Sequence, residues 1–527
     1  MTDDTTDHDD PVDDQLPAPL SRKKLWLFRL IAMVVIPLLL LGGLELALRI
    51  VGYGYPTAYF VHAKGADVYS VNSQFGLRFF TPEMNRRAGP AYIAKDKVAG
   101  SYRIFVLGGS AAQGVPDPAY SFGEILKTML SETYPDATFE VVPTAMTAIN
   151  SHVVLPVARD CAKYEPDLFI VYMGNNEVVG PFGAGTVFDG FNSDLGVIRA
   201  KIASRKWKII QLTSNIGHRM RAGSGTPKWE SMAMFMDNHV PANDPRMAGV
   251  YSHFQSNLED ICKAAYSEGA DTLVCTVGSN LQDCAPFASE HKAGLTAEQL
   301  AQWDQAYQAG IALAEAGEDA EALAAFQQAE AIDTDYAELR FRMAQCYRAT
   351  GQDELARQAF VAARNLDVLR FRADTRINTI VRDVASSHQN EKVHLVDVEA
   401  AMAKPGPSGE ARIAGSEFFY EHVHMTFEGN YQVAAALFPQ VVDQLPEAIR
   451  SQSPNPQIPS LASCADAMGM NQAQRAQLLL YVLDMTARQP FLGQFDYDER
   501  RADMQREYDR LQRELELDEN RPFGDPS

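Results

Sequence analysis

Five short apolar runs, each bounded by turn-forming residues, recur along the middle of the chain and predict the strands of a buried sheet. They span residues 104–107, 139–142, 168–173, 272–277 and 393–397. Continuous apolar runs of this length are typical of parallel strands that are covered on both faces. Stretches with helical spacing separate several of them, for example residues 247–269. This alternation predicts an α/β fold with helices on both faces of a parallel sheet.

An internal repeat interrupts the alternation between the fourth and fifth runs. Three packing positions recur 34 residues apart: Ala322, Phe326 and Ala329 return as Ala356, Phe360 and Ala363. This period, with small and large residues at these offsets, is that of tetratricopeptide repeats. We therefore expect two such repeats at residues 301–368, inserted in the sheet domain and capped by a helix at 369–387. An ordinary pair of helical hairpins is the alternative.

The longest apolar stretch lies near the N-terminus. Residues 25–51 are almost wholly apolar, and residues 30–44 carry no charge. Such a helix can cross a hydrocarbon core of about 30 Å at about 1.5 Å per residue. Basic residues 22–24 precede it, which predicts a signal-anchor with a disordered acidic cytoplasmic tail at 1–24 and a periplasmic or extracellular remainder. A cleaved signal peptide is the alternative, although no small-x-small cleavage site follows.

Composition divides the rest of the chain. Residues 52–100 mix aromatic residues, Gly and Pro with no sustained period, and are expected to form a membrane-proximal segment. The sheet domain is expected at 101–300 and 369–450, on either side of the repeats. A Ser- and Pro-rich linker then leads to C-terminal helices, together covering 451–527, and we expect these helices to pack on the sheet domain as an appendage. A length of 527 residues is sufficient for several domains.

Charge and cysteine content restrict the function classes. The formal net charge of −21 argues against a nucleic-acid partner, because phosphate binding needs a basic face. The six cysteines are scattered without a Cys-x-x-Cys pair, so neither a zinc site nor a redox motif is expected. Cys275 and Cys284 could form a disulfide in an oxidising compartment, and six buried free thiols are the alternative. No cofactor is expected.

Three polar segments follow predicted strands and would meet at one edge of the sheet, because parallel strands place their carboxyl ends together. Ser110 follows the first run through two glycines, and Asn176 follows the third run. Glu421 and His424 lie in a Glu-His-Val-His segment after the fifth run. His424 could take the hydroxyl proton of Ser110, and Glu421 could orient the imidazole.

If Ser110 attacks a carbonyl group, the oxyanion that forms would need hydrogen-bond donors. The Asn176 amide could supply one, the backbone N–H of Ser110 a second, and a backbone N–H near Ala148 a third. Each residue also has a simpler interpretation: Ser110 and Asn176 could cap helices, and Glu421 could be a solvated loop charge. His422 and His424 could bind a metal, but the sequence has no further Cys/His cluster at ligand spacing.

These segments resemble the sequence blocks of the SGNH (GDSL-like) hydrolases. Gly108-Gly109-Ser110 is similar to the first block, usually Gly-Asp-Ser, and Gly174-Asn-Asn-Glu177 to the third. Glu421-x-x-His424 is similar to the fifth, usually Asp-x-x-His. The second block falls at residues 142–151, where Pro143 and Ala148 stand at the positions of the family's Asn and Gly.

The resemblance implies a three-layer flavodoxin-like fold and metal-free hydrolysis or transfer of an ester-linked acyl group. Ser110 would be the nucleophile, His424 the base and Glu421 its orienting carboxylate, with Ser110, Ala148 and Asn176 as oxyanion donors. The chain would be a membrane-anchored extracytoplasmic esterase or O-acyltransferase for a short acyl group, with a cell-envelope polysaccharide as a candidate acceptor. The alternative is an inactive hydrolase-like scaffold that binds a protein partner through the repeats.

One more charged segment follows the repeats. Arg370, Arg372 and Asp374 could line the pocket and bind an anionic substrate, or could form ion pairs on the surface of a helix.

Overall fold

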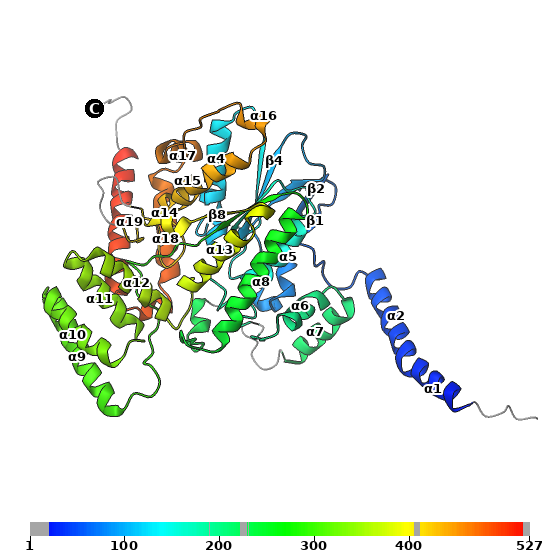
Figure 1. Cartoon of the computed structure of the whole chain (residues 1–527). Coiled ribbons are helices and arrows are strands. Elements are labelled where there is room, and N and C mark those ends of the chain that lie inside the picture. The colour runs from blue at the N-terminus through cyan, green and yellow to red at the C-terminus, as the bar shows by residue number, and fades with distance from the viewer. Residues whose placement is uncertain (1–20, 189, 222–228, 230, 405–411, 520–527) are drawn as a thin grey trace, which may run out of the picture. The chain divides into compact units, whose positions relative to one another are not determined.

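The computed structural model describes residues 21–188, 190–221, 229, 231–404 and 412–519 (Figure 1). The chain divides into two compact units, residues 1–55 with 204–224 and residues 56–203 with 225–527. Most of the predicted acidic tail lies outside the described residues. Helix begins at Arg22, so residues 22–24 belong to the apolar helix and not to the tail.

A five-stranded parallel sheet forms the centre of the larger unit. Its strands are β4 (Tyr102–Gly108), β5 (Phe139–Pro143), β6 (Leu168–Tyr172), β7 (Asp271–Cys275) and β8 (Val393–Val396). Their order across the sheet is β5-β4-β6-β7-β8, and each adjacent pair is parallel. All residues of β4 and β6 are buried, as continuous apolar runs require. The prediction of an α/β fold with five parallel strands is confirmed.

Helices cover both faces of this sheet (Figure 1). One layer contains α5 (Ser151–Cys161), α8 (Arg246–Tyr266) and α13 (Thr375–Ser387). The other contains α4 (Phe122–Thr133) and α15 (Phe427–Gln444), with α17 (Leu461–Met468) packed on α4. Helix α4 buries Phe122, Ile125 and Met129 toward the sheet, and Ser121 caps it by accepting a hydrogen bond from the Glu124 N–H.

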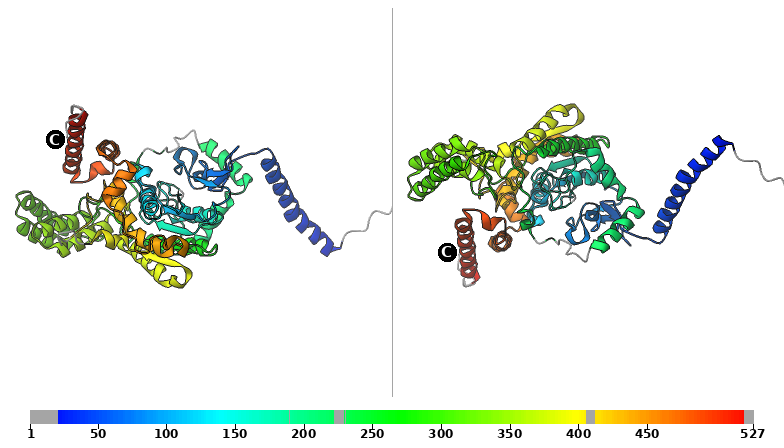
Figure 2. Two further views of the ribbon diagram at one scale, coloured as in Figure 1. Left: turned by 90° about the horizontal axis from the view of Figure 1, so that it is seen from above. Right: turned by 90° about the horizontal axis from the view of Figure 1, so that it is seen from below.

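Residues between β7 and α13 form two helical hairpins. They comprise α9 (Ala297–Glu315), α10 (Asp319–Ile332), α11 (Ala337–Ala349) and α12 (Asp353–Leu366). The hairpins lie side by side in both views of Figure 2, and α10 contacts α11. The repeated Phe326 and Phe360 are both buried, and Gly310 passes so close to the Phe326 ring that a Cβ would lie 2.5 Å from it. The insertion is helical, and its identification as tetratricopeptide repeats remains a prediction.

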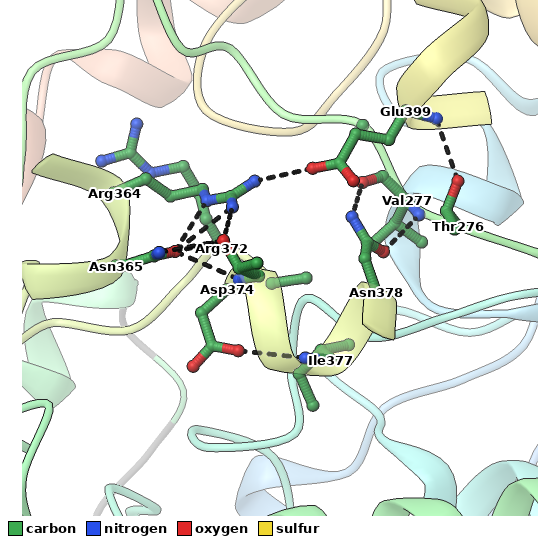
Figure 3. Close-up of polar contacts among 12 residues, drawn as sticks. Thr276, Val277, Arg364, Asn365, Arg372, Asp374, Ile377, Asn378 and Glu399 are labelled. Atoms are coloured by element: carbon green, nitrogen blue, oxygen red, sulfur yellow. Dashed lines mark hydrogen bonds and ion pairs between the residues drawn. The ribbon is translucent and has the colours of Figure 1, made fainter. Parts of the chain in front are cut away.

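The chain returns from the hairpins to the sheet through a buried extended segment (Figure 3). The helix predicted at 369–387 begins only at Thr375, where Asp374 accepts a hydrogen bond from the Ile377 N–H at 3.1 Å. Arg364 at the end of α12 pairs with Glu399 of α14 (Val398–Met402) at 3.2 Å and donates to the Thr375 hydroxyl at 2.9 Å. These contacts join the insertion to the sheet.

Two arginines of this extended segment, Arg370 and Arg372, do not lie where the sequence analysis predicts. Arg370 is buried and pairs with Asp374 at 3.1 Å. Arg372 is also buried, pairs with Asp367 at 3.2 Å and donates to the carbonyl of Cys284 at 2.9 Å. Both expectations, pocket lining and a surface ion-pair helix, are wrong, because the charges are satisfied inside the protein.

Residues 52–100 contain structure that the sequence pattern does not reveal. A small antiparallel sheet forms from β1 (Phe60–His62), β2 (Val68–Val71) and β3 (Tyr92–Ala94). Phe60 packs against the Phe105 ring of β4, so residues 56–100 are part of the larger unit and not only a membrane-proximal segment, whereas residues 52–55 belong to the smaller unit. Strands of three or four residues are too short to show an alternating pattern.

The smaller unit contains one long apolar helix and α7 (Lys208–Arg221), which α6 (Leu195–Ser204) precedes in the chain. The long helix consists of α1 (Arg22–Leu30), a π-helical turn (Ile31–Val35) and α2 (Ile36–Ile50). Arg22–Ile50 is long and apolar enough to cross a membrane. An N-terminal signal sequence can have the same length and composition.

The C-terminal part of the larger unit also contains α16 (Glu447–Arg450), α18 (Gln472–Thr486) and α19 (Tyr497–Glu519). All six cysteines lie within the described ranges and are buried free thiols. The disulfide considered between Cys275 and Cys284 is therefore not formed.

Candidate active site

Ser110 lies at the turn where β4 ends and the short helix α3 (Ser110–Gln113) begins. Gly108 makes this turn possible, because a Cβ there would lie 2.1 Å from the carbonyl oxygen of Tyr172 on the neighbouring strand β6. Only glycine permits so close an approach of two backbones. The turn therefore places the Ser110 hydroxyl at the carboxyl edge of the sheet.

His424 and Glu421 complete a chain of contacts that begins at Ser110. The Nε2 atom of His424 lies 2.8 Å from the Ser110 Oγ atom, although the two residues are 314 positions apart in the sequence. The Nδ1 atom of His424 makes a close contact with Oε1 of Glu421, although the geometry of this contact is not that of a hydrogen bond. The sequence-predicted serine, histidine and glutamate are thus in contact in the predicted order.

Backbone hydrogen bonds hold the Glu421 carboxylate in place. The carboxylate is fully buried and accepts hydrogen bonds from the N–H groups of His422 at 2.6 Å and His424 at 2.9 Å. Its second oxygen also contacts Nδ1 of His422, whose ring packs against Phe287 and Phe371. The tight loop explains how a glutamate three residues before the histidine can reach the imidazole.

The protonation state of His424 suits a general base. Burial lowers the pKa of His424 to about 4, so the imidazole is neutral at neutral pH. A neutral imidazole carries one N–H donor and one acceptor nitrogen. With Nδ1 facing a carboxylate, the proton is favoured there, which leaves Nε2 to accept the proton of the Ser110 hydroxyl.

The two other predicted site residues lie beside Ser110. Asn176 follows β6, and its amide nitrogen donates to the Ile149 carbonyl at 3.1 Å and lies 3.1 Å from where a Cβ on Gly109 would be. An amide nitrogen carries two hydrogens, so a second donor is available. Ala148 has a φ of 57°, the left-handed region that favours glycine, and lines the same cavity as Ser110 and Asn176.

Asn175 and Glu177, on either side of Asn176, have structural partners. Asn175 accepts a hydrogen bond from the Ala373 N–H at 3.0 Å. Glu177 is buried and accepts hydrogen bonds from the N–H of Ser151 at 2.8 Å and from its hydroxyl at 2.7 Å. Ser151 is the first residue of α5 and lies three positions after Ala148. Glu177 therefore holds the segment that carries one of the candidate oxyanion donors.

Glu177 should make the stability of the protein depend on pH. Burial raises the pKa of Glu177 to about 7, from an ordinary value of 4.5. Between these values the unfolded chain ionises this group and the folded chain does not, so stability falls as the pH rises from about 4.5 to about 7. We expect Glu177→Gln to reduce the fall in Tm between pH 5 and pH 8, as measured by thermal unfolding. An identical fall in both proteins would contradict this role.

A cavity of about 310 Å³ opens above Ser110. Aromatic and apolar side chains form much of its wall, among them Phe188, Phe235, Phe371 and Phe491. The polar part of the lining includes Arg86, whose guanidinium carbon lies 4.1 Å from the centroid of the Trp229 ring and whose Nε atom donates to the Thr147 hydroxyl at 3.1 Å. The cavity thus combines an apolar wall with a cationic group.

Sequence reasoning missed these wall residues. Arg86 comes from the segment in which no element was expected, and Tyr481, Met485 and Arg488 come from helix α18 and the turn after it. We expected the C-terminal helices to be an appendage, but they supply part of the site. No local signal marks them, because their spacing is that of any packed helix.

Within the described part of the chain, no group of three or more His, Cys, Asp or Glu side chains could hold a metal ion.

Comparisons with known proteins find similarity of structure and not of sequence. No family model and no curated protein matches the chain. Among the solved structures that are similar to it are TesA, a GDSL-like lipase from Bacteroides thetaiotaomicron, and an acetyl xylan esterase.

The three similarities are weak in both sequence and structure. TesA is 10% identical with a TM-score of 0.27, and the alignment covers 65% of this chain and 99% of TesA. The lipase is 9% identical with a TM-score of 0.29, covering 66% and 92%. The esterase is 11% identical with a TM-score of 0.27, covering 64% and 99%. At these values the similarity carries no argument about function, which is inferred from this chain's own residues.

Proposed function

We propose that this protein is a serine esterase or O-acyltransferase, anchored to a membrane by its N-terminal helix, with the catalytic unit outside the cytoplasm. The observation that carries the proposal is the continuous contact from Ser110 through His424 to Glu421, at the carboxyl edge of a parallel sheet and in a cavity. Ligands bind at this edge in open α/β sheets. A hydroxyl, a neutral imidazole and a buried carboxylate in this order activate a serine for nucleophilic attack.

The chemistry follows from these positions. The Ser110 oxygen attacks the ester carbonyl carbon while Nε2 of His424 takes the hydroxyl proton. The oxyanion that forms accepts hydrogen bonds from the Asn176 amide and from the N–H groups of Ser110 and Ala148. The intermediate then expels the alcohol, which receives the proton from His424, and leaves an acyl group on Ser110. Water or an acceptor hydroxyl removes that acyl group by the same steps.

The cavity indicates the class of substrate. A volume of about 310 Å³ is at the small end of ligand sites, which span about 300–1,000 Å³. A short acyl group fits this volume and would contact the apolar wall, and a polysaccharide hydroxyl is the candidate acceptor at the open side. The helical insertion, α9–α12, is a candidate docking surface for a protein partner.

The rival function is an inactive scaffold that uses the helical insertion alone. The contact between Ser110 and His424 weighs against it, because a scaffold gives no reason to hold a serine and a neutral histidine at 2.8 Å. The two functions differ in one direct test, hydrolysis of p-nitrophenyl acetate by the purified full chain and by Ser110→Ala. The enzyme proposal expects a clear rate that is lost in the variant. Equal rates in both proteins would overturn it.

The pH profile of that reaction is a further prediction. Because burial lowers the pKa of His424 to about 4, the base form is fully present above about pH 5. We expect kcat/KM to change less than about twofold between pH 5 and pH 7, whereas an enzyme whose histidine has an ordinary pKa near 6.5 would lose about 25-fold. Rates measured in buffers of constant ionic strength test this, and a steep fall toward pH 5 would contradict it.

A further inference from the structure

The smaller unit contains a helix whose first turn is held by an acidic residue of the apolar helix. Glu45 of α2 accepts hydrogen bonds from the N–H groups of Lys208 and Ile209, both at 3.0 Å. These are the first two residues of α7, whose free N–H groups favour a carboxylate. Arg49 also donates to Glu45 at 2.8 Å. Glu45 is buried, although the helix around it is largely exposed.

Part of the exposed surface of α7 is a largely apolar stripe, and the exposed Arg219 lies outside it. The side chains of Ile210, Ile216 and Met220 are exposed at 36%, 50% and 82%. They are spaced six and four residues apart, which places them on one side of a helix, with Thr213 and Gly217 between them. Trp207, just before the helix, is also exposed. No charged residue interrupts this stripe.

The opposite, polar face of α7 contacts its own unit. Gln211 is buried and accepts a hydrogen bond from the Tyr55 N–H at 3.0 Å. Asn215 donates to the Tyr53 hydroxyl at 3.0 Å. The helix is therefore oriented with its polar side toward protein and its apolar side outward, the reverse of a helix on the surface of a water-soluble domain.

The segment is also basic in an acidic chain. Residues 204–221 contain five Lys and Arg residues and neither Asp nor Glu, whereas the whole chain has a net charge of −21. A basic helix with an exposed apolar face that includes a neighbouring Trp is typical of helices that lie in a membrane surface. The basic residues would be attracted to anionic lipid headgroups.

We propose that α7 lies in the membrane surface at the C-terminal end of the anchor helix, with Ile210, Ile216 and Met220 in the lipid and the basic residues among anionic headgroups. This inference rests on the proposed anchoring of Arg22–Ile50. Glu45 lies five residues before the end of α2, which is about 7.5 Å at about 1.5 Å per residue. With the end of α2 at the membrane surface, the start of α7 would be at the depth of about 5–10 Å that interfacial helices occupy.

A spin label tests where α7 lies. The full chain, carrying Ile216→Cys with a nitroxide label, is reconstituted in vesicles of phosphatidylcholine with phosphatidylglycerol. Collision rates with oxygen and with a water-soluble nickel chelate are then measured. The matched control is Leu355→Cys on α12, an apolar residue exposed at 43% in the helical insertion. The six native thiols are buried, and the labelled wild-type chain gives their background.

The expected result is that the label at residue 216 collides mainly with oxygen and the label at residue 355 mainly with nickel. Equal nickel accessibility at the two positions would overturn the proposal. A label at Leu39→Cys, in the middle of the apolar helix and exposed at 70%, reports the anchoring separately. If residue 39 is in lipid and residue 216 is in water, the anchoring stands and this inference fails. If both are in water, both fail.

The composition of the vesicles tests the role of the charge. In vesicles of phosphatidylcholine alone, the basic residues lose their anionic partners, so we expect higher nickel accessibility at residue 216. An unchanged depth would overturn the part assigned to the basic residues.

Discussion

Replacing His424 with alanine is expected to lower kcat for p-nitrophenyl acetate by about a thousandfold or more. Nε2 of His424 lies 2.8 Å from the Ser110 oxygen and is the acceptor for its proton. A serine hydroxyl without a base is a poor nucleophile, so attack on the ester would be slowed directly. Steady-state kinetics of the full chain and of the variant, with Tm measured for both, test this expectation.

A second histidine provides the control for this variant. His394 lies on β8 of the same sheet and pairs with Asp271 at 3.0 Å, so it resembles His424 in having a carboxylate partner. We expect His394→Gln to keep kcat within about threefold of the wild-type value, because it changes a histidine–carboxylate pair outside the cavity wall. Comparable losses in the two variants would mean that His424 acts through folding and not as a base.

Replacing Asn176 with alanine is expected to lower kcat by about 10²–10³-fold and to leave KM nearly unchanged. The amide nitrogen lies next to the turn that carries Ser110, in the cavity that also contains Ala148. A donor that binds the oxyanion stabilises the transition state more than the substrate, so the loss appears in kcat. Initial rates over a range of substrate concentrations separate the two constants.

The control for Asn176 is Asn192→Ala. Asn192 lies in an exposed loop, where its side chain accepts a hydrogen bond from the Asp194 N–H at 2.8 Å. Its replacement removes an asparagine amide that lies outside the cavity wall. We expect kcat and KM of this variant to stay close to the wild-type values. If Asn176→Ala instead raises KM with kcat unchanged, the residue binds substrate and does not stabilise an oxyanion.

The sheet could be predicted from the sequence because each of its strands belongs to a mostly apolar run. Each of β4 to β8 is a run of four to seven residues, mostly apolar, and burial on both faces produces that pattern directly. The strands β1 to β3 could not be predicted, since most of their residues are only partly buried or exposed and no continuous apolar run marks them. The burial of Arg370 and Arg372 could not be predicted, because it depends on the backbone carbonyls of Val240 and Asn280, which are distant in sequence and accept their hydrogen bonds.

Part of the candidate site could also be predicted from the sequence, and part could not. Ser110 and Asn176 could be found because they closely follow parallel strands, where ligands bind in such sheets. Glu421 and His424 could be found because a carboxylate and a histidine close together in the sequence can activate a serine. The aromatic wall could not, because Phe235 or Phe371 has the same local pattern as a core residue. Its position beside Ser110 depends on tertiary packing. The contribution of α18 likewise requires that a helix more than 300 residues away in sequence folds back over the serine.

Covalent labelling of Ser110 by a fluorophosphonate tests the central claim most directly, because the reagent reacts with an activated serine whatever the natural substrate is. The full chain is incubated with the reagent, digested and examined by mass spectrometry, beside Ser110→Ala and His424→Ala. We predict an adduct on the peptide that contains Ser110, none in Ser110→Ala and much slower labelling in His424→Ala. An unmodified Ser110 peptide, together with ester hydrolysis that persists in Ser110→Ala, would contradict the account.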